Sequence, residues 1–180
     1  DYVTNGTPLP QKPIIVSFDD GYVSNYNYAY PVLRELDMKA TIFIITDRRG
    51  KALSRNPHFS WNQAREMADS GVIEFGSHTY SHQPLPALDA FNLEFELRTS
   101  KNMIERHLGR KCSVVSYPEG AYNEQVMAAA QAAGYQMANK VGDEGVNRPQ
   151  EGFFALKRLT ANGNWTGQRL LREIQDNMEL

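Results

Sequence analysis

The chain has 180 residues, 19 basic against 21 acidic side chains and 41% hydrophobic residues, which suits one globular domain with a sizeable core. No stretch approaches the roughly 20 apolar residues that cross a bilayer, and the formal net charge of -2 disfavours sequence-independent binding to nucleic acid or anionic lipid. The single cysteine, Cys112, excludes an intramolecular disulfide and Cys-based zinc clusters, so any metal must be held by histidine and carboxylate side chains. Because there is no initiator Met and no signal-type segment, we expect a trimmed piece of a longer protein.

The first twelve residues lack periodicity and contain two prolines, which predicts an irregular lead-in over residues 1–12 before a domain over residues 13–180. Six short apolar or β-branched runs follow, each typical of a buried strand. They are residues 14–18, 40–45, 72–75, 112–117, 136–141 and 153–159.

Helical patterns lie between these runs. Two apolar stripes have helical spacing: Tyr26, Tyr30, Leu33 and Leu36, and then Leu93, Leu97, Ile104 and Leu108 ahead of Gly109. Helix starts are predicted at Ser60, which makes a capping box with Gln63, at Asn123 and at Thr166. This alternation implies parallel strands with crossover helices, in either an open doubly wound sheet or a closed barrel, between which periodicity does not decide.

Chemistry-bearing residues follow the first and third runs. Asp19 and Asp20 precede Gly21 directly after the first run, and His78 and His82 lie four residues apart after the third. Because functional groups gather at the carboxyl ends of parallel strands, we expect these side chains at one rim, with both imidazoles on one face of a helical turn. Two His and one Asp would make a catalytic metal site with an open position, and the second carboxylate would take a proton from the metal-bound water. The plainer alternatives are an acidic N-capping turn and two surface or core histidines.

Three segments in order, SFDDG at 17–21, HTYSH at 78–82 and YPEG at 117–120, resemble the polysaccharide deacetylases of carbohydrate esterase family 4, whose shared unit is the NodB homology domain. The chain looks similar to the poly-N-acetylglucosamine deacetylase-like branch. The resemblance implies a distorted (β/α) barrel, a divalent metal (zinc, with cobalt or nickel as alternatives) and removal of acetyl groups from N-acetylglucosamine-type or O-acetylated polysaccharides. By that resemblance Asp19 is the general base, and Asp20, His78 and His82 are the metal ligands.

The resemblance also implies roles after the fourth run. The residues expected to contact the substrate and its oxyanion, in part through a backbone N–H, are Tyr117, Pro118, Glu119 and Gly120. The Glu119 carboxylate is unfavourable beside developing negative charge unless it points away. Ser116 stands where the family has an arginine that orients the base. Arg158 is our candidate substitute as a catalytic-site residue that holds Asp19, and an ordinary strand-end cation is the alternative.

Other positions depart from the family pattern. The histidine that serves the family as general acid aligns with Gly163. His58 and His107 are expected to be solvated surface histidines and not replacements for it. Asp143, near the place of the family's fourth motif, is expected in a solvated turn.

Two functions remain as hypotheses. The first is a metal-dependent deacetylase of an acetylated polysaccharide or oligosaccharide, and the alternative is a carbohydrate-binding domain on a degenerate deacetylase scaffold, favoured by the missing acid. A purely structural domain is disfavoured because folding does not require four metal-competent residues at one rim. The family resemblance alone implies an extracytoplasmic location, and the particular polysaccharide and the oligomeric state stay open.

Overall fold

Five short strands form one parallel sheet in the computed structural model, which describes residues 5–51, 56–142 and 144–178. They are β1 (Val16–Phe18), β2 (Ala40–Ile44), β3 (Ile73–Ser77), β4 (Val114–Ser116) and β5 (Met137–Asn139). Each strand pairs in parallel with its neighbour along the chain, so the order is β1-β2-β3-β4-β5. Because the order never reverses, the sheet is not doubly wound. It curls into a half-barrel, which confirms the barrel class.

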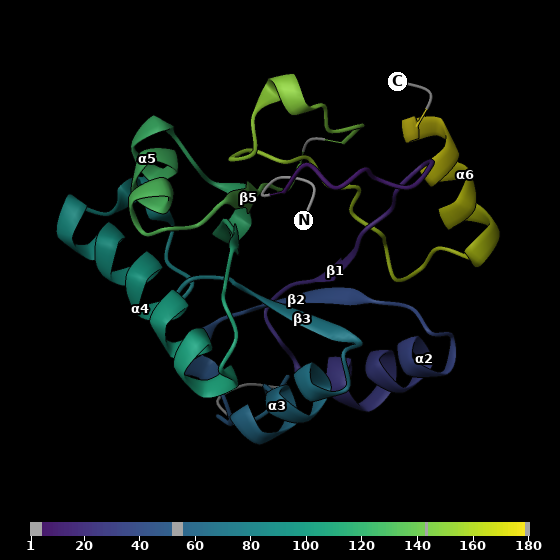
Figure 1. Ribbon diagram of the computed structural model, residues 1–180, viewed down its shortest axis with the longest axis horizontal. Helices are drawn as coiled ribbons and strands as arrows, with labels where there is room; N and C mark the ends of the chain where they lie inside the picture. The colour runs from purple at the N-terminus through teal and green to yellow at the C-terminus, as the bar shows by residue number, and fades with distance from the viewer. Residues whose placement is uncertain (1–4, 52–55, 143, 179–180) are drawn as a thin grey trace.

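The helices follow one another around the curved sheet (Figure 1). They are the π-helical turn η1 (Asn25–Ala29), α2 (Tyr30–Glu35), α3 (Trp61–Asp69), α4 (Ala90–Leu108), α5 (Glu124–Ala132) and α6 (Gly167–Met178). Short 3-10 turns occupy η2 (Thr46–Arg48), η3 (Leu85–Ala87), η4 (Pro118–Gly120) and η5 (Pro149–Glu151). The helix α6 lies apart from α4 and α5 in this view, on the far side of the sheet.

The predicted helix boundaries are confirmed by their caps. The Ser60 hydroxyl accepts a hydrogen bond from the Gln63 N–H at 3.3 Å, and the Gln63 side chain accepts one from the Ser60 N–H at 2.8 Å. Asn123 caps α5 by accepting from the Val126 N–H at 2.9 Å. Thr166 accepts from the Arg169 N–H at 3.2 Å at the start of α6. Gly109 ends α4 in the left-handed region, with a φ of 64°.

Most predicted strands are shorter than expected, and the first and last runs depart in ways that can be followed residue by residue. The first begins at Val16, because Ile14 and Ile15 are exposed and lie outside the sheet. The run over residues 153–159 makes only one parallel bridge, between Leu156 and Asn139 of β5. Leu156 bonds to β5 through its N–H to the Ala138 carbonyl and through its carbonyl to the Lys140 N–H, both at 2.9 Å. The backbone N–H and carbonyl of the next residue, Lys157, bond to the side chain of Asn147 at 2.7 and 2.9 Å.

The first apolar stripe does not form one regular helix. Its residues divide between η1 and α2, and Leu36 lies past the end of α2 with 60% of its surface exposed. Pro31, at the start of α2, has no N–H with which to continue the α-helical ladder, and the π-helical turn precedes it. Residues 6–15 contain no helix or strand and residues 1–4 lie outside the described part, so the lead-in over residues 1–12 stays a prediction.

The core lies between the sheet and its outer helices. The central strands β2 and β3 are buried along nearly their whole length, and α4 adds Leu93, Leu97 and Ile104. The register pairs Ile44 with Ser77 and Phe18 with Ile42, so the residues that follow β1 and β3 leave the sheet at the same rim. Within the described residues, no helix has the length and apolar character to cross a bilayer.

Truncating Leu97 to alanine should lower the free energy of unfolding by about 2 to 5 kcal/mol. The reason is that its side chain is fully buried, with 0% of its surface exposed, in the core between α4 and the sheet. Phe91→Ala on the same helix is the control, since Phe91 is 78% exposed and should change the stability by no more than about 0.5 kcal/mol. Urea unfolding measures both. Equal losses in the two variants would contradict this packing of α4.

Candidate metal centre

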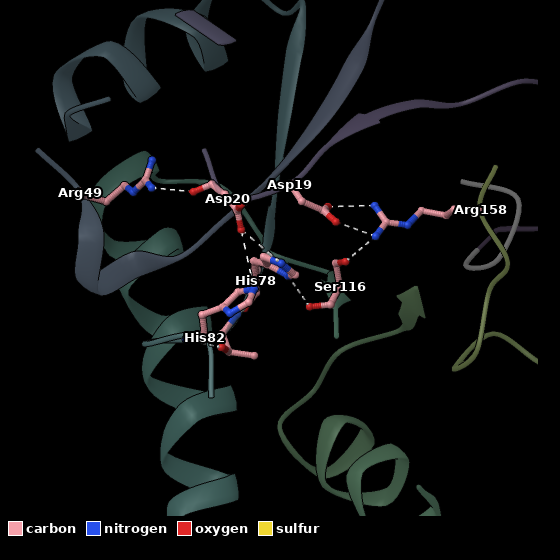
Figure 2. A network of polar contacts seen from close by, with 9 residues as sticks. Asp19, Asp20, Arg49, His78, His82, Ser116 and Arg158 are labelled. Carbon is pink, nitrogen blue, oxygen red and sulfur yellow. Dashed lines mark hydrogen bonds and ion pairs between the residues drawn. The ribbon is translucent and has the colours of Figure 1, made fainter. Parts of the chain in front are cut away.

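Asp20, His78 and His82 converge at the rim of the sheet, as Figure 2 shows. One ligand atom from each lies within 4.8 Å of the others. The Asp20 Oδ1 is 3.5 Å from the Nε2 of His78 and 3.8 Å from the Nε2 of His82. Ligands of a tetrahedral ion with bonds of about 2.1 Å lie about 3.4 Å apart, so the donor atoms and their spacing fit a divalent metal. Three protein ligands would leave a position open for water or substrate.

The two histidines reach this point from an irregular turn and not from the expected helical turn. Thr79 and His82 both adopt left-handed conformations, with φ of 65° and 64°. The Ser77 hydroxyl accepts from the Thr79 N–H at 3.0 Å, and the Thr79 hydroxyl accepts from the His82 N–H at 3.1 Å. Local hydroxyl groups therefore fold the turn, and the spacing of four residues brings the imidazoles together without helical geometry.

The ring of His78 is oriented by a backbone carbonyl of β4. Its Nδ1 lies 2.8 Å from the Ser116 oxygen. Because a carbonyl only accepts, Nδ1 carries the hydrogen and Nε2 is left with a free lone pair toward Asp20. Burial lowers the pKa of His78, which favours the neutral form that binds metals.

Asp19 is held by Arg158. The Nη1 and Nη2 of Arg158 donate to the two Asp19 oxygens at 2.8 and 2.7 Å. Nη2 also donates to the Ser116 hydroxyl at 2.9 Å (Figure 2). Nε donates to the Lys140 carbonyl at 3.3 Å. Burial alone would raise the pKa of Asp19, but the hydrogen bonds and charge of Arg158 help bring it below its ordinary 3.8. The expected contact between Arg158 and Asp19 is thus present.

The segment after β4 presents one backbone donor. The Tyr117 N–H bonds to the Asn139 carbonyl at 3.0 Å, Pro118 has no N–H, and the Gly120 N–H bonds to the Tyr117 carbonyl at 3.0 Å. The Glu119 N–H has no acceptor among the described residues. Glu119 has a φ of 57° and an exposed side chain, so its carboxylate points into solvent.

Two of these residues act in packing. The ring of Tyr117 is buried, stacks on Tyr122 at 5.5 Å between centroids and donates its hydroxyl to the Phe154 carbonyl at 3.0 Å, so its side chain is unavailable to a substrate. The expected contact of Tyr117 with the substrate or its oxyanion stays a prediction. A Cβ on Gly120 would lie 2.7 Å from the Val141 backbone, which explains the glycine.

The other histidines and the positions that depart from the family pattern lie in different environments. His58 is 8% exposed, which corrects its expected place on the surface, and His107 stacks on Trp61 with centroids 4.2 Å apart. Gly163 is exposed in a turn. Asp143 lies outside the described residues.

Arg49 was missed by the sequence argument. Its guanidinium donates to the carbonyls of Asp20 and Gly21 at 2.8 Å each. A basic residue just after a strand is typical of a solvated turn, so the sequence carries no signal of this contact.

Comparison with known proteins gives consistent matches. Residues 6–138 match the family model described as polysaccharide deacetylase. YxkH of Bacillus subtilis, provisionally named a polysaccharide deacetylase, is 37% identical over 87% of this chain and 54% of that protein. A poly-beta-1,6-N-acetyl-D-glucosamine N-deacetylase of Staphylococcus epidermidis is 24% identical over 86% of this chain and 56% of that protein. The chain thus spans about half the length of these relatives.

Two solved structures have similar folds. The Streptococcus pyogenes deacetylase PplD in complex with acetate has a TM-score of 0.87 and 25% identity, over 96% of this chain and 75% of that one. IcaB from Ammonifex degensii has a TM-score of 0.83 and 26% identity, over 97% of this chain and 77% of that one.

Replacing Arg158 by glutamine should raise the pKa of Asp19, because burial remains while the guanidinium is lost. Carboxyl NMR titration of metal-free protein should place the Asp19 midpoint below 3.8 in the wild type and higher in the variant. Since the folded pKa lies below the unfolded one, ionised Asp19 stabilises the wild-type fold above that unfolded value, and the stabilisation is lost as the pH falls through the folded pKa.

Arg110→Gln is the matched control, because Arg110 pairs with the exposed Asp69 at 3.2 Å, away from the site. It should leave the Asp19 midpoint unchanged. An Asp19 pKa that does not rise in Arg158→Gln would contradict the electrostatic role given to this ion pair.

Proposed function

The chain belongs to the polysaccharide deacetylase family, and we propose that it is a metal-dependent hydrolase that removes acetyl groups from an N-acetylglucosamine-type polysaccharide. The observation that carries this proposal is the placement of Asp20, His78 and His82 around one point, with the separately oriented carboxylate of Asp19 beside them. The names of the Staphylococcus epidermidis relative and of PplD support a deacetylase, and the former supports poly-N-acetylglucosamine as the substrate class.

Asp20, His78 and His82 are the residues that would hold the metal, with zinc as our first choice and cobalt or nickel as alternatives. When bound, such an ion lowers the pKa of water and polarises the acetyl carbonyl. The hydrogen bond from His78 Nδ1 to the Ser116 carbonyl keeps Nε2 aimed at that point. The imidazole of His78 is thus oriented before any ion or substrate arrives.

Asp19 is the general base in this proposal. Its low pKa keeps it ionised at neutral pH, and Arg158 orients it by a fixed, two-pronged contact. It takes the proton of the water that attacks the acetyl carbon, and the Glu119 N–H donates to the oxygen on which negative charge develops. The C–N bond then breaks to give acetate and the free amine of the sugar.

The protonation of the departing amine is where this chain differs from its family. Gly163 is exposed and has no side chain to donate a proton. The proton that Asp19 takes from the water is available at the site, and we propose that it returns to the amine.

The absence of a proton-donating side chain at Gly163 also favours a second candidate, a carbohydrate-binding domain with little or no turnover. We further propose, from family membership, an extracytoplasmic location.

Two single substitutions separate the roles of the adjacent aspartates. Asp20→Ala should lose both the bound metal and the release of acetate, because one of three ligands is gone. Asp19→Asn should keep the metal and lose about 10²- to 10⁴-fold in rate, the usual contribution of a general base. Metal analysis and acetate release from N-acetylglucosamine oligomers, with zinc, cobalt or nickel added, measure both.

His107→Ala is the control. It should keep the metal and the rate, because His107 of α4 stacks on Trp61 of α3 and is not one of the residues placed in the metal site. Unchanged activity in Asp20→Ala would overturn the assignment of the ligands. Binding of the oligomers without turnover under any of the three metals would favour the second candidate.

A further inference from the structure

Arg49 is a buried cation beneath the turn that carries Asp20. Its exposed fraction is only 8%, although it lies in the turn that directly follows η2. Its Nη2 donates to the Asp20 carbonyl and its Nη1 to the Gly21 carbonyl, both at 2.8 Å, and its Nε donates to the Ile45 carbonyl at 3.1 Å. Figure 2 shows this side chain reaching Asp20 from the side opposite to Arg158.

The guanidinium is fixed on its other faces as well. It lies over the ring of Phe59, 4.6 Å from the centroid. No carboxylate in the described part of the chain forms an ion pair with it. Its hydrogen bonds go to three backbone carbonyls, those of Asp20, Gly21 and Ile45. Burial lowers the pKa of Arg49 to about 9, so the charge persists at neutral pH. Burial, with Arg49 and Arg48 close by, also lowers the pKa of His58 to about 4, so His58 is neutral beside it.

The turn above Arg49 needs support because two successive residues are left-handed. Asp20 has a φ of 67° and Gly21 a φ of 76°. For a residue with a side chain, such as Asp20, this conformation is unfavourable because the Cβ crowds the backbone. A Cβ on Gly21 would lie 2.5 Å from the Arg49 Nη1 and 2.9 Å from the Ile44 Cγ2, so the glycine and the arginine fit closely together.

We propose that Arg49 is the positioning residue of the metal site: its guanidinium clamps the carbonyls of Asp20 and Gly21 and thereby holds the Asp20 carboxylate against His78 and His82. This inference rests on the proposed metal site and adds a residue outside the three sequence segments that define it. The metal ligand is then preformed, because the backbone that carries it does not reorganise when an ion binds. A lysine at position 49 would keep the charge and lose the fork that reaches two carbonyls at once.

The test compares Arg49→Lys and Arg49→Met with Arg65→Lys as the control. Arg65 also donates to a backbone carbonyl, that of His107 at 2.6 Å, but on the exposed surface between α3 and α4. Titration of metal-free protein with Co²⁺ gives the Kd and the visible spectrum, which reports the arrangement of ligands. Both Arg49 variants should bind about 10- to 100-fold more weakly, with an altered spectrum. Arg65→Lys should match the wild type.

Thermal unfolding of the metal-free variants separates positioning from general loss of stability. A folded Arg49→Lys with weaker binding and an altered spectrum supports the inference, and this variant answers the question if Arg49→Met does not fold. Wild-type Kd and spectrum in folded Arg49→Lys, with binding abolished in Asp20→Ala, would overturn the role of Arg49 and leave the proposed metal site standing. Failure of the wild type to bind Co²⁺, Zn²⁺ or Ni²⁺ would overturn both.

Discussion

The guanidinium of Arg158 contacts both oxygens of Asp19, at 2.8 and 2.7 Å, across 139 residues of chain. This ion pair joins the end of β1 to the segment beside β5, the two edges between which the described residues form no continuous strand pairing. The same guanidinium also donates to the Ser116 hydroxyl and the Lys140 carbonyl, so one side chain links three parts of the rim. The site depends on this link because it decides where the carboxylate of Asp19 points.

Two adjacent carboxylates would repel each other if both faced the same point. The structure separates them, because the Asp19 carboxylate pairs with Arg158 whereas the Asp20 carboxylate lies beside the two histidines. Asp19 turns to Arg158, while Asp20, in a left-handed conformation, turns toward the two histidines over Arg49. The two roles proposed for neighbouring residues, base and ligand, therefore follow from opposite environments of one dipeptide.

Backbone strain gathers at this rim. Six non-glycine residues in the described ranges have positive φ, and four of them belong to the site: Asp20, Thr79, His82 and Glu119. Such conformations persist only where the surroundings hold them. Here the guanidinium of Arg49 and the hydroxyls of Ser77 and Thr79 do so for the first three. Ser116 also contributes to this arrangement. Its small side chain leaves room for the guanidinium of Arg158 and accepts a hydrogen bond from it.

The sequence by itself determined the βα alternation, most helix caps and the local pairs at the site, because apolar periodicity, capping residues and the neighbours Asp19 and Asp20 or His78 and His82 are short-range properties. It pointed to Arg158 only through the family resemblance, and it left Arg49 and the burial of His58 unnoticed. It also overextended the run over residues 153–159, which forms only the bridge between Leu156 and Asn139 of β5. These features depend on contacts between segments far apart in the chain. Only the tertiary structure, which brings those segments together at one rim, decided how the carboxylates are oriented and which cations contact the Asp19 carboxylate and the Asp20 backbone.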